Sequence, residues 1–391
     1  MTSNLIVGQS GGPTAVINAS LVGVIEEAGA SNQIDRVFGM RRGVEGLLEG
    51  DVTDLTDLSA DTLEALARTP GSALSACRRK ISQTEAAELV KSLNEKGVGY
   101  LCYVGGNDSA DTTHKLALAA TIAGDPLRAI AIPKTIDNDL PETDHCPGFA
   151  SVARYVAIAA VESALDTRSL PTYYPVKILE VMGRDAGWLA AASGLAGTDF
   201  EMGPHLIYVP ELPFDRTAFL TAVADIHAQV GYVVIVVAET VRDHHGNPVA
   251  GDIATVDEFD HPIARGAADS LIRMVESELG LRARSDKPGT LQRSSRLAQS
   301  PVDLAEAREA GKAAVRLALS GATDVMVTVD RVSDDPYGSA MSSADLALIA
   351  NRQRLLPRDF LDPSGTGISE AFRSYAMPLL GPDPFPDYTK L

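Results

Sequence analysis

Residues 100–109 read YLCYVGGNDS, an apolar run that stops at two glycines and three short polar side chains. The apolar residues 100–104 predict a short buried strand, and residues 109–120 have the character of a helix. The glycines between them predict a tight turn. A strand, a turn and a helix in this order form the repeating unit of a parallel sheet.

The same unit recurs along the chain. Residues 5–7 form an apolar run, residues 10–13 (SGGP) a turn, and residues 15–28 a helical segment. Further short apolar strands are predicted at 129–132, 176–181 and 233–237. Because strands that are apolar throughout need helices on both faces, the sequence predicts an α/β fold with parallel sheets. Ligands in such folds bind beyond the carboxyl ends of the strands, where the polar glycine motifs lie.

The chain has 391 residues, a formal net charge of -18 and a pI near 4.8. An acidic surface repels nucleic acids and anionic membranes, so neither partner is expected. An anionic substrate would require basic residues to gather locally. The three cysteines lack the number and spacing of a disulfide framework or a zinc site. The sequence shows no secretory signal and no apolar stretch of membrane-spanning length, so the cytoplasm is expected.

Two glycine turns are candidates for phosphate binding. The turn SGGPT, residues 10–14, lets backbone N–H groups approach a phosphate at a helix start, although it equally suits a plain tight connection. It is not a Walker A loop, because no Gly-Lys-Ser/Thr follows. In GGNDS, residues 105–109, Asp108 suits Mg2+ and Ser109 a phosphate oxygen. The alternative is that Asn107, Asp108 or Ser109 simply caps the helix.

The most specific motif is PKTIDND, residues 133–139, directly after a predicted strand. It combines a cation, a hydroxyl and two carboxylates two residues apart. Phosphoryl transfer to an alcohol needs a base near the hydroxyl, a cation at the transferring group and usually Mg2+. The motif therefore predicts this chemistry, against the alternative of a carboxylate-rich structural turn.

Two later segments add candidate anion sites. In MGRDAGW, residues 182–188, Arg184 suits a substrate oxyanion and Gly183 allows close approach. Five further cations lie within 15 residues and predict either a phosphate site or a solvated basic face: Arg282, Arg284, Lys287, Arg293 and Arg296.

Together these segments resemble the phosphofructokinase family, in the same order and at similar spacing over nearly the whole chain. The motifs are SGG, GSALSACR, GGNDS, PKTIDND, EVMGR and a late QR. QSGGPTAVINAS, GGNDS and PKTIDNDLPETDHCPGF look like the bacterial diphosphate-dependent branch. The resemblance implies two Rossmann-like α/β domains with parallel central sheets and the active site in the cleft between them. It implies a donor-binding domain of residues 1–148 plus about 292–350, and a sugar phosphate-binding domain of residues 149–291 plus about 351–391.

The resemblance also implies individual roles. Asp137 would be the base for the sugar hydroxyl, with Thr135 beside it, and Arg184 and Lys134 would complete the catalytic set. The donor would be bound by Gly11, Arg78, Asn107, Asp108, Ser109 and Lys134, with Asp108 as ligand of the expected cofactor, Mg2+. The sugar phosphate would be bound by Thr135, Asp137, Asp139, Met182, Gly183, Arg184, Glu239, Arg284 and Arg293, the last two holding its 6-phosphate.

Two positions address the donor. ATP-using members usually carry glycine where this chain has Asp108 and Lys134. The Asp108 side chain would crowd the path of a nucleotide, and the Lys134 charge suits a compact diphosphate, so both substitutions favour diphosphate.

The chain also departs from the family pattern. Asn107 stands where the family usually has a metal-binding aspartate. ATP-type enzymes also have a histidine and a cross-subunit arginine that contact phosphate, and this chain has Thr290 and Pro175 at those two positions. Lys177 is a possible substitute for the missing arginine. These changes leave a longer sugar phosphate, such as sedoheptulose 7-phosphate, open as the acceptor.

The resemblance thus implies reversible phosphoryl transfer from diphosphate to fructose 6-phosphate in glycolysis or gluconeogenesis, by a homodimer or homotetramer. An ATP-dependent kinase on the same scaffold and a non-catalytic regulatory subunit are the alternatives. Retention of Asp137, Thr135 and Arg184 argues against the regulatory subunit.

Overall fold

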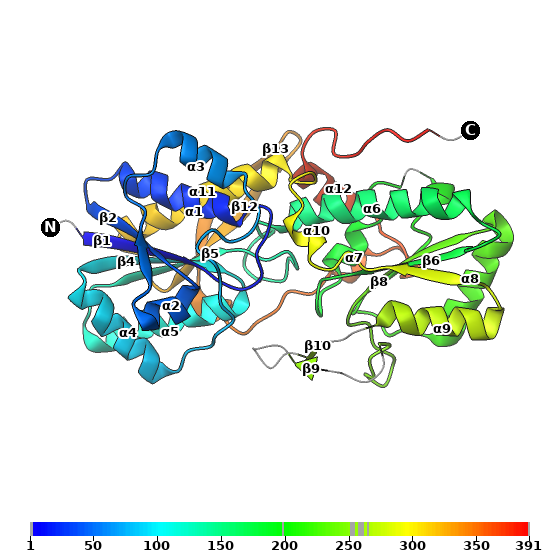
Figure 1. Cartoon of the computed structure of the whole chain (residues 1–391), viewed down its shortest axis with the longest axis horizontal. Coiled ribbons are helices and arrows are strands. Elements are labelled where there is room, and N and C mark those ends of the chain that lie inside the picture. The colour runs from blue at the N-terminus through cyan, green and yellow to red at the C-terminus, as the bar shows by residue number, and fades with distance from the viewer. Residues whose placement is uncertain (1–2, 198, 251–254, 257–261, 264–265, 390–391) are drawn as a thin grey trace. The chain divides into compact units, whose positions relative to one another are not determined.

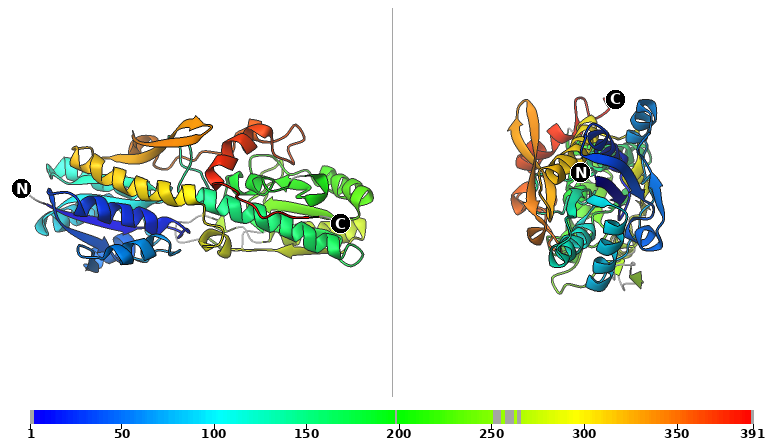
Figure 2. Two further views of the ribbon diagram at one scale, coloured as in Figure 1. Left: turned by 90° about the horizontal axis from the view of Figure 1, so that it is seen from above. Right: turned by 90° about the vertical axis from the view of Figure 1, so that its left-hand side faces the viewer.

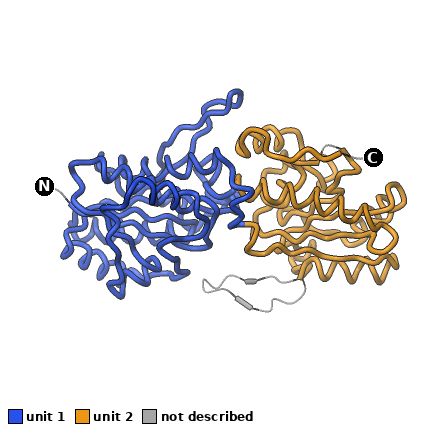
Figure 3. The backbone as a smooth tube through the Cα atoms, turned by 45° about the horizontal axis from the view of Figure 1, so that its top comes forward, with its two compact units in different colours: residues 1–149, 293–354 blue, residues 150–292, 355–391 orange. Residues whose placement is uncertain are grey.

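The computed structural model describes residues 3–197, 199–250, 255–256, 262–263 and 266–389. Two compact units make up the chain: unit 1 comprises residues 1–149 and 293–354, and unit 2 comprises residues 150–292 and 355–391 (Figure 3). The chain therefore crosses between the units three times. Within the described residues, no helix has both the length and the apolar character that crossing a membrane requires.

Unit 1 is built on a seven-stranded sheet in the order β13-β12-β5-β4-β1-β2-β3. The five central strands are parallel, and β13 and β3 pair antiparallel at the two edges. Helices α1, α3 and α11 pack over one face, and α2, α4 and α5 over the other (Figures 1 and 2). The elements are β1 (Ser3–Gln9), α1 (Ile17–Gly29), β2 (Ile34–Met40), α2 (Gly43–Glu49), β3 (Val52–Asp54), α3 (Ala60–Ala67), α4 (Gln83–Glu95), β4 (Val98–Gly105), α5 (Asn107–Ala123), β5 (Arg128–Pro133), α11 (Pro301–Leu319), β12 (Val325–Asp334), β13 (Tyr337–Asp345) and the 3-10 turn η2 (Leu346–Leu348).

Unit 2 is built on a four-stranded, fully parallel sheet in the order β11-β6-β8-β7. Helix α6 lies on one face, and α8 and α9 lie on the other (Figure 1). The elements are α6 (Phe149–Ser169), β6 (Val176–Val181), α7 (Trp188–Ala192), η1 (Phe200–Met202), β7 (Leu206–Tyr208), α8 (Arg216–Val230), β8 (Val233–Ala238), β9 (Thr255–Val256), β10 (Pro262–Ile263), α9 (Ala267–Leu279), β11 (Ala283–Asp286), η3 (Arg358–Phe360), α12 (Glu370–Ala376) and η4 (Met377–Leu380). The short helix α10 (Leu291–Ser294) begins in unit 2 and ends in unit 1.

The predicted α/β fold with parallel sheets is confirmed. The strand predicted at 100–104 is β4, and the helix predicted at 109–120 is α5, which begins two residues earlier. The β12–β13 hairpin is an addition to the prediction. Strands β2, β3, β7, β9, β10 and β11 were not predicted either. Strand β13 has the sequence YGSAMSSAD and no buried residue, so it lacks the apolar run by which β1, β4, β5, β6 and β8 were recognised.

Candidate active site

Three neighbouring strands of unit 1 end beside each other and carry three of the predicted motifs. Strands β1, β4 and β5 are parallel neighbours, and the SGGPT, GGNDS and PKTIDND segments follow their carboxyl ends. The turns are tied together, since the Ser10 N–H donates to the Val104 carbonyl (2.9 Å) and the Lys134 N–H to the Gly105 carbonyl (3.0 Å). The sheet thus gathers segments more than 120 residues apart at one edge, as parallel strand order requires.

Three predicted cations converge on the turn at Gly11 and Gly12. The Lys134 ammonium donates to the Gly12 carbonyl at 2.8 Å, although the residue is only 4% exposed. A Cβ built on Gly12 would lie 2.6 Å from Arg293 Nη1 and 3.8 Å from Arg78 Nη2. Glycine therefore leaves the space in which the Arg293 guanidinium lies, while Arg78 lies beside it at ordinary contact distance. In a chain of net charge -18, this is a local basic site of the kind that an anionic substrate requires.

Two buried polar residues that the sequence analysis missed hold the segment that carries Arg78. Gln9 Oε1 accepts from the Leu74 N–H (3.0 Å), and Asn18 Oδ1 accepts from the Ala73 N–H (3.0 Å). Gln9 also donates to Asn18 at 2.9 Å. The sequence did contain a signal for these two residues. Gln9 is a polar residue at the end of an apolar strand, and Asn18 is a polar residue on the apolar face of the following helix. The Gly11 N–H donates to the Cys77 carbonyl at 3.1 Å, which fixes the other end of this segment to the turn.

The GGNDS motif begins α5. Its N-cap is Gly106, so the expectation that Asn107, Asp108 or Ser109 caps the helix is wrong. Asp108 lies in the first turn, where the helix dipole favours a carboxylate, and forms an ion pair of 3.4 Å with Lys80. Ser109 is buried. The Asn107 side chain makes hydrogen bonds with backbone atoms of Asn351 and Arg352, far along the chain.

The PKTIDND segment is a tightly held loop. Thr135 and Asn138 are buried, while Asp137 and Asp139 are half-buried. The Asp137 N–H donates to Thr135 Oγ1 (3.1 Å), and Asn138 Oδ1 accepts from the Cys146 N–H (2.9 Å). Asn138 has a left-handed backbone with φ 55°, a conformation that asparagine tolerates better than most other non-glycine residues. The loop therefore presents both carboxylates from a fixed backbone.

A buried charged cluster follows this loop in unit 1. His145 is 1% exposed and lies between Asp144 (2.8 Å) and Glu306 (2.7 Å). Burial alone would lower the pKa of His145, but the hydrogen bonds to the two carboxylates outweigh it and raise the pKa to about 9. Tyr337 and Ser339 of β13 both donate to Glu306 Oε1 at 2.6 Å. The cluster thus links the segment that follows the PKTIDND loop to α11 and to the β12–β13 hairpin.

In unit 2, Met182, Gly183 and Arg184 follow β6, and Glu239 follows the neighbouring strand β8. The Arg184 N–H donates to Glu239 Oε1 at 3.2 Å, and Thr240 Oγ1 donates to the Arg184 carbonyl. Arg184 also has a left-handed backbone, with φ 49°. Burial raises the pKa of Glu239 above its usual value, an effect that the Arg184 N–H partly offsets. These predicted residues are brought together.

Glu211 is a further carboxylate at the MGRDAGW segment that the sequence analysis missed. Its Oε1 accepts from the Gly187 N–H and from the Leu356 N–H, both at 2.8 Å. Its Oε2 is buried and accepts no hydrogen bond from the described residues. Burial raises the pKa of Glu211 above its usual value, and the two N–H groups partly offset this. No motif marks this residue, because it holds the loop only through backbone groups.

Arg284 is not brought to Arg184 and Glu239 within unit 2. It pairs in register with Lys177, the second residue of β6, while Arg184 follows the last. About 13 Å of strand separate Lys177 from Val181. The Arg284 guanidinium lies over the Tyr174 ring instead, 3.1 Å from its centroid. Lys177, proposed as a substitute for the missing arginine, is buried and forms ion pairs with Asp286 (2.7 Å) and Asp166 (3.6 Å).

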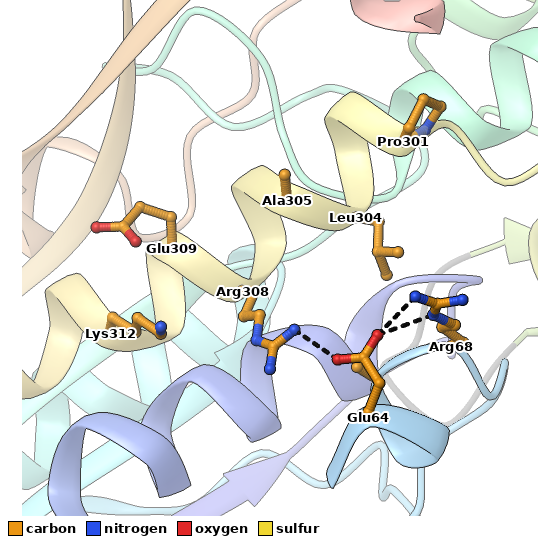
Figure 4. A pocket seen from close by; sticks show the side chains of 9 residues that line it. Glu64, Arg68, Pro301, Leu304, Ala305, Arg308, Glu309 and Lys312 are labelled. Carbon is orange, nitrogen blue, oxygen red and sulfur yellow. Dashed lines mark hydrogen bonds and ion pairs between the residues drawn. The ribbon is translucent and has the colours of Figure 1, made fainter. Parts of the chain in front are cut away.

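A separate pocket of about 330 Å³ lies between α3 and α11 in unit 1 (Figure 4). None of the predicted site residues lines it. Its cations face carboxylates: Glu64 pairs with Arg68 (2.7 Å) and Arg308 (3.0 Å), and Lys312 pairs with Glu26 (3.2 Å). The pocket is therefore a poor candidate for a phosphate compared with the turn at Gly12.

The donor set for a metal is small. Among the described residues, no three His, Cys, Asp or Glu side chains form a cluster that could hold an ion. Mg2+ in phosphoryl-transfer sites is commonly held by one or two carboxylates together with substrate phosphates. Asp108, a single carboxylate at the end of the GGNDS turn, fits that type of site.

The family model described as Phosphofructokinase matches residues 4–318. The chain is 42% identical to a pyrophosphate--fructose 6-phosphate 1-phosphotransferase of Xanthomonas campestris pv. campestris, covering 99% of this chain and 96% of that one. It is 40% identical to a protein of the same name from Halomonas elongata, with 98% and 93% covered. A crystal structure of pyrophosphate-dependent phosphofructokinase from Marinobacter aquaeolei superposes with a TM-score of 0.88 at 38% identity, over 99% of this chain and 94% of that one. The chain belongs to the phosphofructokinase family.

Proposed function

We propose that this protein is a diphosphate-dependent 6-phosphofructokinase. It transfers a phosphoryl group reversibly from diphosphate to fructose 6-phosphate, giving fructose 1,6-bisphosphate and phosphate. The observation that carries the proposal is the convergence of Arg78, Lys134 and Arg293 on the Gly11–Gly12 turn of an acidic chain. The names of the full-length bacterial relatives support both substrates.

The donor site favours a compact anion over a nucleotide. Lys134 supplies a buried positive charge beside the Gly12 carbonyl, and Asp108 stands in the first turn of α5 with Lys80 beside it. Glycine at these two positions would leave room for a nucleoside, whereas the side chains present occupy that space and add charge. This is the specific reason for preferring diphosphate to ATP.

The acceptor chemistry follows from the carboxylate loop and from unit 2. Asp137 takes the proton of the sugar hydroxyl, the hydroxyl oxygen bonds to the terminal phosphorus, and the bond to the bridging oxygen breaks to release phosphate. Arg184 stabilises the charge of the transferring group, and Glu239 orients both Arg184 and the sugar. Mg2+, held by Asp108 and the donor oxygens, would neutralise the charge of the diphosphate.

The two units carry different parts of the proposed site. Unit 1 carries Gly11, Arg78, Asp108, Lys134 and Asp137, and is proposed to bind the donor. Unit 2 carries most of the residues proposed for the sugar phosphate (Met182, Gly183, Arg184, Glu239 and Arg284), while Thr135, Asp137 and Asp139 belong to unit 1. Arg293 belongs to unit 1 in the structure and lies beside Gly12, so its proposed partner is the donor rather than the 6-phosphate. A cytoplasmic homodimer or homotetramer stays a prediction.

A coupled assay for fructose 1,6-bisphosphate tests the proposal, with fructose 6-phosphate, Mg2+ and either diphosphate or ATP. Turnover with diphosphate alone supports it. Turnover with ATP alone would show that Asp108 and Lys134 do not select the donor. If neither donor supports turnover, sedoheptulose 7-phosphate is the next acceptor to assay, and failure there would favour a regulatory subunit.

A further inference from the structure

Residues 351–356, here called the strap, join unit 1 to unit 2: Arg354 is the last residue of the first and Leu355 begins the final segment of the second. The strap has no regular secondary structure beyond a turn at its first residue. It nevertheless makes hydrogen bonds with three segments that carry proposed site residues, and each of these bonds lies within a single unit. The residues that make them are Asn107, Arg354 and Glu211.

Asn107 binds the start of the strap with both ends of its amide. Its Oδ1 accepts from the Asn351 N–H (2.5 Å), and its Nδ2 donates to the Arg352 carbonyl. Asn351 Nδ2 adds a bond to Asp111 Oδ1 (3.0 Å), one turn further along α5. An aspartate at position 107 could not make this pair, because a carboxylate has no donor for the Arg352 carbonyl. The strap therefore accounts for asparagine at the position where the family usually has a metal-binding aspartate.

Arg354 braces the catalytic loop. Its Nη1 donates to the carbonyls of Thr143 and Asp144, both at 2.6 Å, and its Nη2 donates to the Asn138 carbonyl at 2.9 Å. Its backbone N–H donates to the Asp139 carbonyl at 2.7 Å. The planar guanidinium thus closes the loop that begins at Asp137, by bonds that a lysine ammonium could not reproduce with the same geometry.

Leu356, two residues later, binds the other unit's loop. Its N–H donates to Glu211 Oε1, the same oxygen that accepts from the Gly187 N–H. Gly187 follows Arg184 by three residues, so Glu211 connects the strap to the backbone that presents Arg184. Replacement of Gly187 by a larger residue would bring its Cβ within 2.5 Å of the Glu211 carboxylate.

We propose that Asn107, Arg354 and Glu211 are positioning residues for the phosphoryl transfer, acting through the strap on the loops of Asp108, Asp137 and Arg184. This inference rests on the proposed function, and it assigns Asn107 to the strap rather than to the donor. The strap is a single six-residue segment. It therefore supports the backbone of the loop that carries Asp137 through Arg354, and the backbone of the loop that carries Arg184 through Leu356 and Glu211.

The test compares Arg354→Met with Arg352→Met. Both variants remove one positive charge from the strap, but only main-chain atoms of Arg352 take part in hydrogen bonds within the described residues. The kinetics of the full-length protein are measured with diphosphate and fructose 6-phosphate, and amide hydrogen exchange is measured over residues 136–146. We expect Arg354→Met to lower kcat at least thirtyfold, to change both KM values less than threefold, and to speed exchange in the loop. Arg352→Met should match the wild type in all three.

Exchange separates this inference from the proposed function, because it requires no turnover. Unchanged exchange in Arg354→Met, or faster exchange with kcat within twofold of the wild type, would overturn the positioning role. If Arg354→Met does not fold, Asn107→Asp replaces it. A fall in kcat at constant KM for diphosphate supports the strap, whereas a raised KM for diphosphate at constant kcat would return Asn107 to the donor site.

Discussion

Replacing Lys134 by methionine should damage diphosphate use far more than sugar use. The ammonium is buried and lies 2.8 Å from the Gly12 carbonyl, at the turn where Arg78 and Arg293 also lie. Two unit charges about 4 Å apart interact by about 4 kcal/mol at an effective dielectric of about 20. Truncating one partner of a buried charge pair costs about 2–5 kcal/mol, so about 3 kcal/mol is a reasonable expectation. Since 1.4 kcal/mol is tenfold, kcat/KM for diphosphate should fall on the order of a hundredfold.

The assay is a diphosphate titration at saturating fructose 6-phosphate, followed by a fructose 6-phosphate titration at saturating diphosphate. KM for fructose 6-phosphate should change less than threefold, because the Lys134 ammonium contacts the Gly12 carbonyl at the proposed donor turn rather than a residue proposed for the sugar. Lys91→Met, at an exposed position of α4, makes the same change in net charge and should leave kcat/KM unaltered. A loss below fivefold for Lys134→Met in a protein with normal thermal stability would refute the assignment of this lysine to the donor. Equal losses in the Lys91 variant would show that only net charge matters.

Three further predictions follow from the same geometry. Asp137→Asn should lower kcat by about 10²–10⁴ while KM for the sugar changes little, because the amide cannot accept the hydroxyl proton; near-normal turnover would exclude Asp137 as the base. Asp108→Gly should lower both kcat/KM for diphosphate and the affinity for Mg2+, and it should permit measurable turnover with ATP in the same coupled assay. An unchanged preference for diphosphate over ATP would contradict the proposal that Asp108 selects the donor. Glu306→Gln should lower the free energy of unfolding by about 3 kcal/mol near pH 6, because it leaves the His145 cation short of one buried partner. Since the folded pKa of His145 is about 9 and its unfolded value about 6.5, the stabilisation is fully present below pH 6.5 and is lost as the pH rises through 9. The difference in Tm between this variant and the wild type should therefore shrink across that interval, and a constant difference would argue against a charged His145.

The parts of the fold that could be predicted are those with a local signature. The run at 100–109 predicts β4, its turn and α5, because a buried strand and the start of a helix each leave a pattern within a few residues. The motifs after β1, β4 and β5 could be assigned to one site, because parallel strands place their carboxyl ends at one edge. The contacts of the strap could not, because Asn107 meets backbone groups 244 and 245 residues away, and any residue supplies such groups.

The same distinction explains which site residues were missed. Gln9, Asn18 and Glu211 act on backbone N–H groups, so nothing in the residues they hold reveals them. The resemblance assigned Arg293 to the sugar phosphate, a role that stays a prediction, and in the structure Arg293 belongs to unit 1 and lies beside Gly12. Its neighbour Gln292 instead accepts from the Met182 N–H of unit 2 at 3.4 Å. Gln292 and Arg293 are adjacent residues of the short helix α10, yet they contact different units. The order of residues in the sequence does not reveal this division.

The start of α5 shows how two adjacent residues divide the work of one motif. A carboxylate at position 107 would face the Arg352 carbonyl with no hydrogen to donate, whereas the Asn107 amide donates to it. The negative charge that a metal needs is then left to Asp108, also in the first turn, where the positive end of the helix dipole stabilises it. Lys80 compensates that carboxylate at 3.4 Å, and an incoming Mg2+ with diphosphate would replace an exposed ammonium as its partner. In the proposed reaction, Asp108 is thus left as the carboxylate for Mg2+, while Asn107 binds the strap that we propose positions the loops of Asp137 and Arg184.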